Sequence, residues 1–279
     1  MNLNALSYSD LTELRSLAER VARDAGTHVR NLREKGVTVA AAKSSPVDIV
    51  TLGDQAAEQI IVAELRDWRH SDAILGEEGT NRAGASGITW ILDPIDGTTN
   101  YFYNQPNYCV SVAACVADTS YSEGYRAVAG AVYVPTSAEL FSAAAGLGAT
   151  LNGKKLRINE AAPLSESLIA TGFGYSAKKR ARQAEVLLEV LPRVRDIRRS
   201  GSAAYDLCAL AAGRLDAYYE AGLKVWDYAA AELIAREAGA TVTGAAAAGV
   251  ISSKPGTPLL IAGPAETVKA LQPLLPALK

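Results

Sequence analysis

Histidine is almost absent from this chain of 279 residues, which contains only His28 and His70. We expect both on the surface, because one lies in a predicted helix and the other in a polar stretch; this argues against histidine-based catalysis. The three cysteines, Cys109, Cys115 and Cys208, lie in apolar runs and lack the spacing of zinc ligands. Buried, reduced thiols in a cytoplasmic protein are the simplest interpretation.

Three further absences narrow the class of protein. No run of about 18 apolar residues occurs, so the sequence predicts no membrane-spanning helix. Residues 1–10 are polar, without a basic segment followed by an apolar one, which predicts no secretion signal. Lys plus Arg total 28 and Asp plus Glu total 30. This near balance argues against nucleic acid or an anionic membrane as the main partner.

The most informative stretch is residues 88–100. Its apolar start, 88–92, predicts a short buried strand, and Asp93 and Asp96 follow with Pro94 between them. Because proline fixes its own φ and favours extended geometry in the residue before it, both carboxylates are expected on a stiff corner. Hard oxygen ligands suit Mg²⁺, and the helix expected at 97–100 would offer free N–H groups to phosphate. Either aspartate alone would fit an acidic surface turn; the whole string favours adjacent metal and phosphate sites.

Three other motifs contribute acidic side chains. Asp54 can form a helix cap with Thr51, and taken alone this is as good an interpretation as a catalytic role. Glu77 and Glu78 follow a predicted strand at 73–75 and are flanked by glycines, which fits either two metal-binding oxygens or a solvated turn. Asp227 lies at the start of a helix predicted at 226–238, which Gly239 should end.

The hydrophobic periodicity predicts two halves with different architectures. In residues 1–150 we expect two helices, the first at about 10–35 with a capping box formed by Asp10 and Glu13, on a sheet of mostly hairpin-connected strands. The strand at 110–116 alternates as if half-buried; others are expected at 128–134 and 139–145, with a hairpin turn at 152–153. Residues 151–279 alternate helices and strands, as in an α/β half. The helices are expected at 182–191, 203–212 and 226–238, and the strands at 168–171, 215–220, 241–243 and 259–262.

Together, the motifs at 43–54, 76–78, 93–100 and 226–227 resemble those of the inositol monophosphatase family, in the same order and with similar spacing. The likeness extends from the first helix to about residue 262. It implies a mixed α+β and α/β fold, the layered αβαβα sandwich of the sugar phosphatases, and a homodimer. It also implies a lithium-sensitive phosphomonoesterase with two to three Mg²⁺ ions in each active site.

The resemblance also implies a role for individual residues. The metal ligands would be Glu77, Asp93, Asp96, Asp227 and the carbonyl of Ile95. Glu77 and Thr98, with Asp54 behind Thr98, would orient a metal-bound water and accept its proton during direct attack on phosphorus. Residues assigned to phosphate and substrate binding are Asp96, Gly97, Thr98, Gly201, Ser202, Ala203, Glu220 and Asp227.

The substrate is a weaker inference than the reaction. Glu220 ends a predicted strand and could accept hydrogen bonds from two neighbouring hydroxyls of a polyol, which favours an inositol monophosphate. Histidinol phosphate, fructose 1,6-bisphosphate and a nucleotide 3′-phosphate are the alternatives within the family. Another class also remains open, a transcription-complex or RNA-associated accessory protein. That reading rests on two basic clusters, at 178–182 and 193–199, which otherwise fit a solvated helix face.

Overall fold

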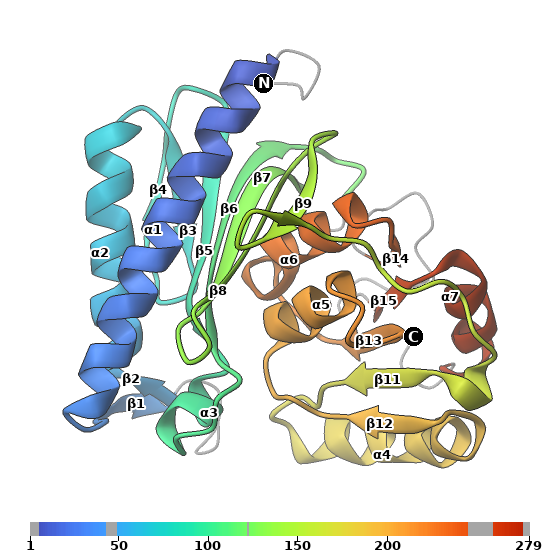
Figure 1. Cartoon of the computed structure of the whole chain (residues 1–279). Helices are drawn as coiled ribbons and strands as arrows, with labels where there is room; N and C mark the ends of the chain where they lie inside the picture. Colours follow the sequence, from blue (N-terminus) through green and yellow to red (C-terminus); the bar gives the residue numbers. More distant parts are fainter. Residues whose placement is uncertain (1–5, 43–48, 122, 245–258, 276–279) are drawn as a thin grey trace.

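The computed structural model describes residues 6–42, 49–121, 123–244 and 259–275, and these form five layers (Figure 1). Helices α1 (Tyr8–Glu34) and α2 (Leu52–Trp68) cover one face of an eight-stranded sheet. Helices α5 (Ala203–Ala211) and α6 (Val225–Glu237) lie between that sheet and a five-stranded one. On the far side of the second sheet are α4 (Ala177–Val190) and α7 (Ala265–Leu271). The predicted αβαβα sandwich is therefore confirmed.

The first sheet has the strand order β10-β9-β8-β7-β6-β5-β3-β4 and is antiparallel except where β3 pairs with β5. Its strands are β3 (Ala73–Gly76), β4 (Asn81–Arg82), β5 (Ile88–Asp96), β6 (Cys109–Ala117), β7 (Tyr125–Val134), β8 (Glu139–Ala144), β9 (Gly148–Leu151) and β10 (Lys154–Lys155). The turn between β9 and β10 contains Asn152 and Gly153, both with positive φ, as the hairpin signal predicted. A separate hairpin joins β1 (Val39–Ala42) to β2 (Ile49–Thr51).

Strand β6 is more buried than its alternating pattern predicted. All its residues except Ala117 are buried, because α1 packs on one face of the sheet and α6 on the other. The expectation of a half-buried strand was therefore wrong. Small side chains such as Ala113 and Ala114 allow the helices to approach both faces closely.

The second sheet has the order β12-β11-β13-β15-β14. Its strands are β11 (Leu168–Thr171), β12 (Asp196–Arg198), β13 (Ala217–Ala221), β14 (Thr241–Thr243) and β15 (Leu259–Gly263). Strand β11 is parallel to β12 and β13, whereas β15 is antiparallel to β13 and β14, so this half is mixed. Periodicity did not predict β12. The division into 1–150 and 151–279 stays a prediction, and β10, beyond that boundary, still belongs to the first sheet.

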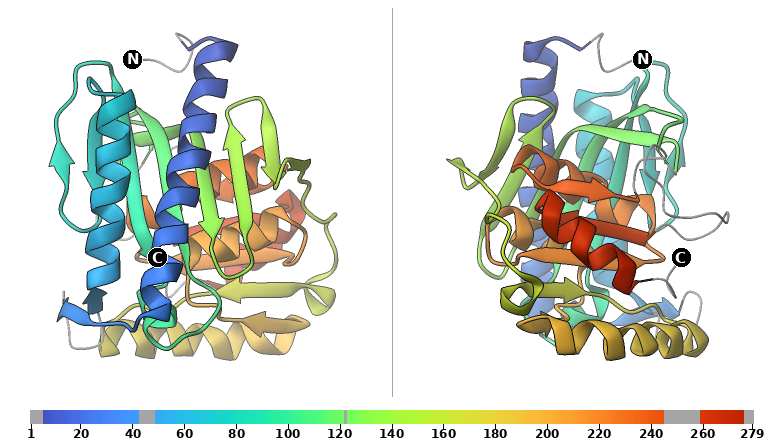
Figure 2. Two further views of the ribbon diagram at one scale, coloured as in Figure 1. Left: turned by 60° about the vertical axis from the view of Figure 1, so that its left-hand side comes forward. Right: turned by 90° about the vertical axis from the view of Figure 1, so that its right-hand side faces the viewer.

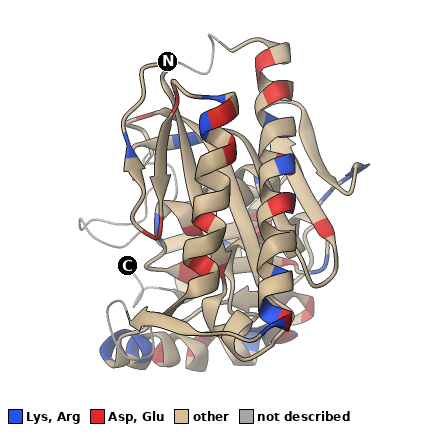
Figure 3. Cartoon of the chain, turned by 90° about the vertical axis from the view of Figure 1, so that its left-hand side faces the viewer, with Lys and Arg blue, Asp and Glu red and all other residues tan. Residues whose placement is uncertain are grey.

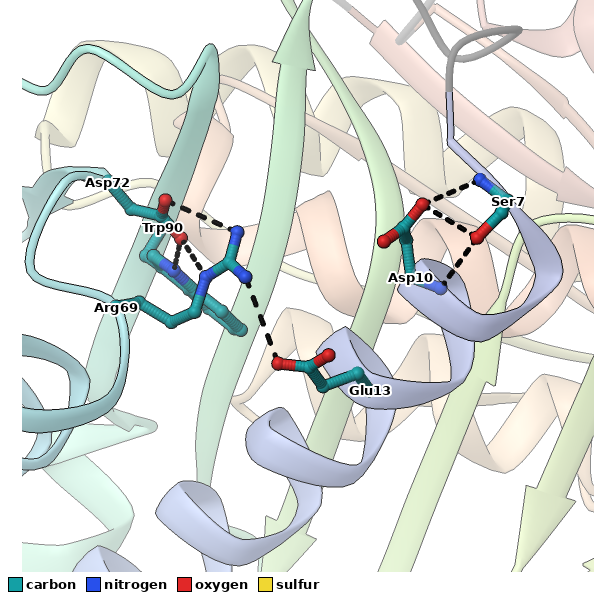
Figure 4. Close-up of polar contacts among 6 residues, drawn as sticks. All are labelled: Ser7, Asp10, Glu13, Arg69, Asp72 and Trp90. Atoms are coloured by element: carbon teal, nitrogen blue, oxygen red, sulfur yellow. Dashed lines mark hydrogen bonds and ion pairs between the residues drawn. The ribbon is translucent and has the colours of Figure 1, made fainter.

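The cap of α1 differs from the expected one (Figure 4). Ser7 is the N-cap: its Oγ accepts from the Asp10 N–H at 3.2 Å, and the Asp10 carboxylate accepts from the Ser7 N–H at 2.8 Å. Asp10 is thus the acidic partner of the capping box and not its first residue. Glu13, expected in that role, instead lies 3.9 Å from Arg69.

Buried polar contacts fix the start of β5 against neighbouring segments. The Trp90 indole N–H donates to Asp72 at 2.9 Å, and Arg69 donates to the same carboxylate at 2.8 Å. The helices α1 and α2 run side by side across the outer face of the sheet (Figure 2). Among the residues that the structure describes, no helix combines the length and apolar character needed to cross a membrane.

Candidate active site

A cavity of about 400 Å³ opens where the ends of β3 and β5 meet the N-termini of α5 and α6. Nearly all the predicted site residues line it. They are Glu77, Asp93, Ile95, Asp96, Gly97, Thr98, Gly201, Ser202, Ala203, Glu220 and Asp227. Asp54 does not line the cavity and lies behind Thr98, as expected. Part of the motif at 43–54, including Lys43, falls outside the described residues.

A β-bulge turns Asp93 and Asp96 toward the same cavity. In a regular strand, residues three apart point to opposite faces. Here Asp93 pairs with Ser111 and Asp96 with Cys109, so three steps along β5 match two along β6. The extra residue shifts the alternation of side chains by one. The strand was predicted to end at residue 92, but it continues through the bulge to Asp96.

Three carboxylates converge at the centre of the cavity. Glu77 follows β3, Asp93 lies on β5, and Asp227 lies in the first turn of α6. One oxygen from each lies within 4.8 Å of the others. The Asp227 Oδ2 also accepts from the Lys224 N–H at 2.6 Å, which fixes this carboxylate at the helix start. Three hard oxygen ligands at this spacing form a suitable site for a divalent cation.

Burial and repulsion by neighbouring charges disfavour the charged forms of Asp93 and Asp227. Burial, followed by the charges of Glu77 and Asp96, raises the pKa of Asp93 well above its ordinary 3.8. Burial and the charge of Glu77 do the same to the pKa of Asp227. Such shifts mark a place where negative charge is concentrated without compensation from the protein. A bound cation would supply that compensation.

Asp96 links the cluster to α5. Its Oδ2 accepts from the Ser202 hydroxyl at 2.6 Å and from the Ala204 N–H at 2.7 Å. Burial raises the pKa of Asp96 to about 7, although these two hydrogen bonds oppose the shift. Ser202 also caps α5 by accepting from the Tyr205 N–H at 3.1 Å. The predicted substrate loop at 201–203 therefore touches a predicted metal ligand directly.

The pair formed by Asp54 and Thr98 has the expected contact. The Thr98 hydroxyl lies 3.1 Å from Asp54 Oδ1 and 3.1 Å from the Ile95 carbonyl oxygen, and it can donate a hydrogen bond to either atom. Thr98 begins the short helix α3 (Thr98–Phe102) after Gly97, whose φ of 94° favours glycine. Asp54 and Thr51 form the predicted capping box of α2, which confirms the helix-cap interpretation, while the catalytic role of Asp54 stays a prediction. Burial raises the pKa of Asp54.

Sequence reasoning missed Glu58, which holds the loop that carries Glu77. The Glu58 carboxylate accepts from the Glu78 N–H at 2.9 Å, the Thr80 N–H at 3.0 Å and the Thr80 hydroxyl at 2.6 Å. It lies so close to Gly76 that any Cβ there would collide with it. Its spacing of four from Asp54 puts both carboxylates on one side of α2. The spacing from Asp54 was the one sequence feature that could have identified Glu58, because a glutamate in a helix does not by itself predict a supporting contact.

Glu220 lies at the other end of the cavity. Its Oε2 accepts from the Tyr218 hydroxyl at 2.7 Å, and its carboxylate lies against Gly172, where a Cβ would collide with it. Burial raises the pKa of Glu220, while the nearby charge of Arg199 opposes that shift. The cavity thus combines a cluster of carboxylates that could hold a metal ion with a second region, around Glu220, where the charge of Arg199 acts on the carboxylate.

The basic cluster at 178–182 lies on α4, whose Lys and Arg residues gather at one end of the molecule (Figure 3). Its residues are exposed, and Lys179 lines the cavity as well. Arg180 donates to the Gly174 carbonyl oxygen at 2.7 Å. In the other cluster, Arg199 alone lines the cavity. Most of these residues form a solvated face, and two lie near enough to the site to influence an anionic substrate.

The model of the inositol monophosphatase family matches residues 10–275. A relative from Mycobacterium tuberculosis, the inositol-1-monophosphatase SuhB, is 46% identical over 267 residues, covering 87% of this chain and 90% of its own. The Nus factor SuhB of Vibrio cholerae is 40% identical over 230 residues, covering 82% and 84%. The solved structure of extragenic suppressor protein suhB from Bartonella henselae aligns with a TM-score of 0.82 at 33% identity, covering 94% and 97%.

The first prediction concerns repulsion among the carboxylates. Folding raises the pKa values of Asp93, Asp96 and Asp227, so the folded state binds protons more tightly than the unfolded one. This tighter proton binding contributes to the stability of the folded state. The contribution is complete below the ordinary pKa of 3.8 and is lost as pH rises through the pKa of the folded state, about 7 for Asp96. In EDTA the Tm should therefore be lower at pH 8 than at pH 5, and Mg²⁺ should raise it most at pH 8.

Asp93→Asn removes one of the repelling charges and one ligand. At pH 8 in EDTA we expect a Tm a few degrees above that of the wild type, little further increase with Mg²⁺, and almost no turnover. Differential scanning fluorimetry measures the first two effects. The exposed Asp196→Asn is the matched control and should behave as the wild type does. An Asp93→Asn protein that Mg²⁺ stabilises as strongly as the wild type would contradict the assignment of Asp93.

The second prediction concerns Glu58. In Glu58→Gln an amide NH₂ replaces an acceptor of the loop N–H groups, so Glu77 should be held less firmly. Removing such a supporting contact typically weakens metal affinity by about 10–100-fold. Titration of Mn²⁺ followed by electron paramagnetic resonance should show this weakening without reference to turnover. Glu64→Gln, on the same helix but paired with Arg20, serves as control; unchanged Mn²⁺ affinity in Glu58→Gln would refute the role.

Proposed function

Because the chain belongs to the inositol monophosphatase family, we propose that it is a Mg²⁺-dependent phosphatase that converts an inositol monophosphate into inositol and phosphate. The observation that carries this proposal is one cavity with the convergent carboxylates of Glu77, Asp93 and Asp227 at one end and Glu220 at the other. We also propose that the protein is a homodimer in the cytoplasm and binds two to three Mg²⁺ ions in each active site.

The donor set fits Mg²⁺. Four carboxylates, from Glu77, Asp93, Asp96 and Asp227, line the cavity, and burial raises the pKa of each of the three aspartates. Oxygen anions are the ligands that this ion prefers, and the carbonyl of Ile95 lies beside them in the same lining. When bound, Mg²⁺ lowers the pKa of a coordinated water and neutralises the charge of the phosphoryl oxygens.

The residues around the acidic end have distinct tasks in this proposal. Thr98, between Asp54 and the Ile95 carbonyl, orients the attacking water through its hydroxyl and passes a proton toward Asp54. The raised pKa of Asp54 makes this carboxylate a better proton acceptor than an exposed aspartate. The backbone of Gly97 and Thr98 faces the phosphoryl group. Attack by water is direct in this proposal: no cysteine is among the residues that line the cavity, and burial, which raises the pKa of the nearby Cys109, makes that thiol a poor nucleophile.

The alcohol part of the substrate would lie toward Glu220. This carboxylate belongs to β13, whereas the acidic cluster is carried by β3, β5 and α6. Separate elements therefore handle the phosphoryl group and the alcohol, and a change in one need not disturb the other. Glu220 suits a polyol because a carboxylate accepts hydrogen bonds from more than one hydroxyl.

A transcription-related role is a second candidate. Relatives about 40% identical to this chain are named Nus factors, and α4 presents an exposed basic face. If this role exists beside catalysis, Asp93→Asn should keep it while losing phosphatase activity, because Asp93 is buried in the cavity.

The deciding experiment is phosphate release from a substrate panel with Mg²⁺ and with EDTA. The panel consists of inositol 1-phosphate, histidinol phosphate, fructose 1,6-bisphosphate, 3′-phosphoadenosine 5′-phosphate and a simple aryl phosphate. We expect the highest kcat/KM for inositol 1-phosphate, no activity in EDTA, and inhibition by Li⁺ at saturating substrate. If another ester is hydrolysed with a higher kcat/KM, that ester replaces inositol 1-phosphate as the proposed substrate. If no ester is hydrolysed in a Mg²⁺-dependent way, the proposed function is wrong.

A third prediction separates recognition from chemistry. Glu220→Gln keeps the shape of the side chain but removes its charge, which weakens hydrogen bonds worth about 1.5–3 kcal/mol each. KM for inositol 1-phosphate should increase about tenfold or more while kcat changes little. The preference for inositol 1-phosphate over the aryl phosphate should fall by the same factor. An equal loss on both substrates would mean that Glu220 supports the metal site or the fold.

A further inference from the structure

Asp206 is a buried carboxylate for which the proposed mechanism has no use. It lies on α5, lines the cavity, and is only 1% exposed. Its Oδ1 atom is buried and has no hydrogen-bond partner among the residues that the structure describes. Buried polar groups in folded proteins nearly always have a partner, because leaving one without it is costly. A carboxylate oxygen without a protein partner in the wall of a substrate cavity therefore indicates a ligand group that donates to it.

The position of Asp206 on α5 places it at the alcohol end of the cavity. Ser202, four residues earlier, faces the acidic end and donates to Asp96. One helical turn separates the two side chains, which lie on the same side of the helix. The charges of Glu220 and then Asp96 add to the rise in the pKa of Asp206 that burial causes, and hydrogen bonding by Ser200 opposes it. Asp206 and Glu220 are thus neighbours in the cavity, and they come from adjacent layers, Asp206 from α5 and Glu220 from β13 of the second sheet.

The charges around this end indicate a neutral alcohol. Glu220 and Asp206 provide acceptors, while Lys179, Arg199 and Lys224 also line the cavity. An alcohol with its own ammonium group would meet those cations, which favours a neutral polyol over an amino alcohol. Burial raises the pKa of Asp206 to about 7, so an uncharged hydroxyl suits either of its protonation states.

We infer that Asp206 is a specificity-determining residue that accepts a hydrogen bond from a second hydroxyl of the polyol, adjacent to the hydroxyl bound by Glu220. The substrate class is therefore a polyol monophosphate in which two neighbouring hydroxyls are both recognised. This inference rests on the proposed phosphatase function and adds to it the number of substrate hydroxyls that the site recognises.

The test begins with the wild-type protein and a set of monodeoxy inositol 1-phosphates, each lacking one hydroxyl. Two analogues with neighbouring positions removed should each lose about tenfold or more in kcat/KM. A result in which only one hydroxyl matters would overturn the inference and leave the proposed function standing. If inositol 1-phosphate itself is not hydrolysed while the aryl phosphate is, both the substrate assignment and this inference fail.

The variant Asp206→Asn identifies which hydroxyl belongs to Asp206. We expect KM for inositol 1-phosphate to rise about tenfold, with a smaller effect on kcat and a fall in preference over the aryl phosphate. For the wild type, the deoxy analogue that lacks the hydroxyl bound by Asp206 should have a lower kcat/KM than inositol 1-phosphate. For Asp206→Asn, the two substrates should have similar kcat/KM values. In Glu220→Gln, a different deoxy analogue should show this loss of discrimination. Asp196→Asn, an exposed aspartate, is the control. Equal losses on both esters, or the same coupled hydroxyl for both variants, would overturn the assignment.

Discussion

The arrangement of the molecule depends on holding several carboxylates together in a buried cavity, where they repel one another. Asp93 is 1% exposed, and both burial and neighbouring charges oppose its ionisation. Apolar packing in the five layers must outweigh that cost. The largest core cluster lies between the two sheets and includes residues from β6, β7, α5 and α6. Strand β5, which carries Asp96, contributes Ile91 to this cluster, and α6 carries Asp227, so apolar packing holds both elements in place.

The acidic residues converge because a few rigid elements end at the same place. Helix α2 contributes twice, with Asp54 against Thr98 and Glu58 under the loop of Glu77. Helix α5 also contributes twice, with Ser202 on Asp96 and Asp206 near Glu220. In each case two side chains four residues apart connect different parts of the site. The relative placement of these side chains around the cavity therefore depends on helix geometry as well as on loops.

Much of this could be predicted from the sequence, and the exceptions have physical reasons. Local patterns located most helices and strands, because periodicity and turn residues act over short distances. The bulge in β5 could not be predicted, since it depends on pairing with β6, and the burial of both faces of β6 depends on α1 and α6. The site residues were identified through a resemblance. By contrast, Glu58 bonds to a loop 20 residues further along the chain, and the Asp206 Oδ1 atom has no hydrogen-bond partner among the described residues. Helical spacing alone gives no sign of such contacts.

Two glycines show how the cavity can change its selectivity without altering its chemistry. Gly76 and Gly172 lie directly against the carboxylates of Glu58 and Glu220, and neither site has room for a methyl group. The second lies in the loop after β11, outside the elements that carry the acidic cluster. A single added carbon there would displace Glu220 and reshape this part of the cavity, without direct contact with Asp93 or Asp227. Divergence of substrate preference within such a fold therefore has a short mutational path, through the backbone opposite the recognition group.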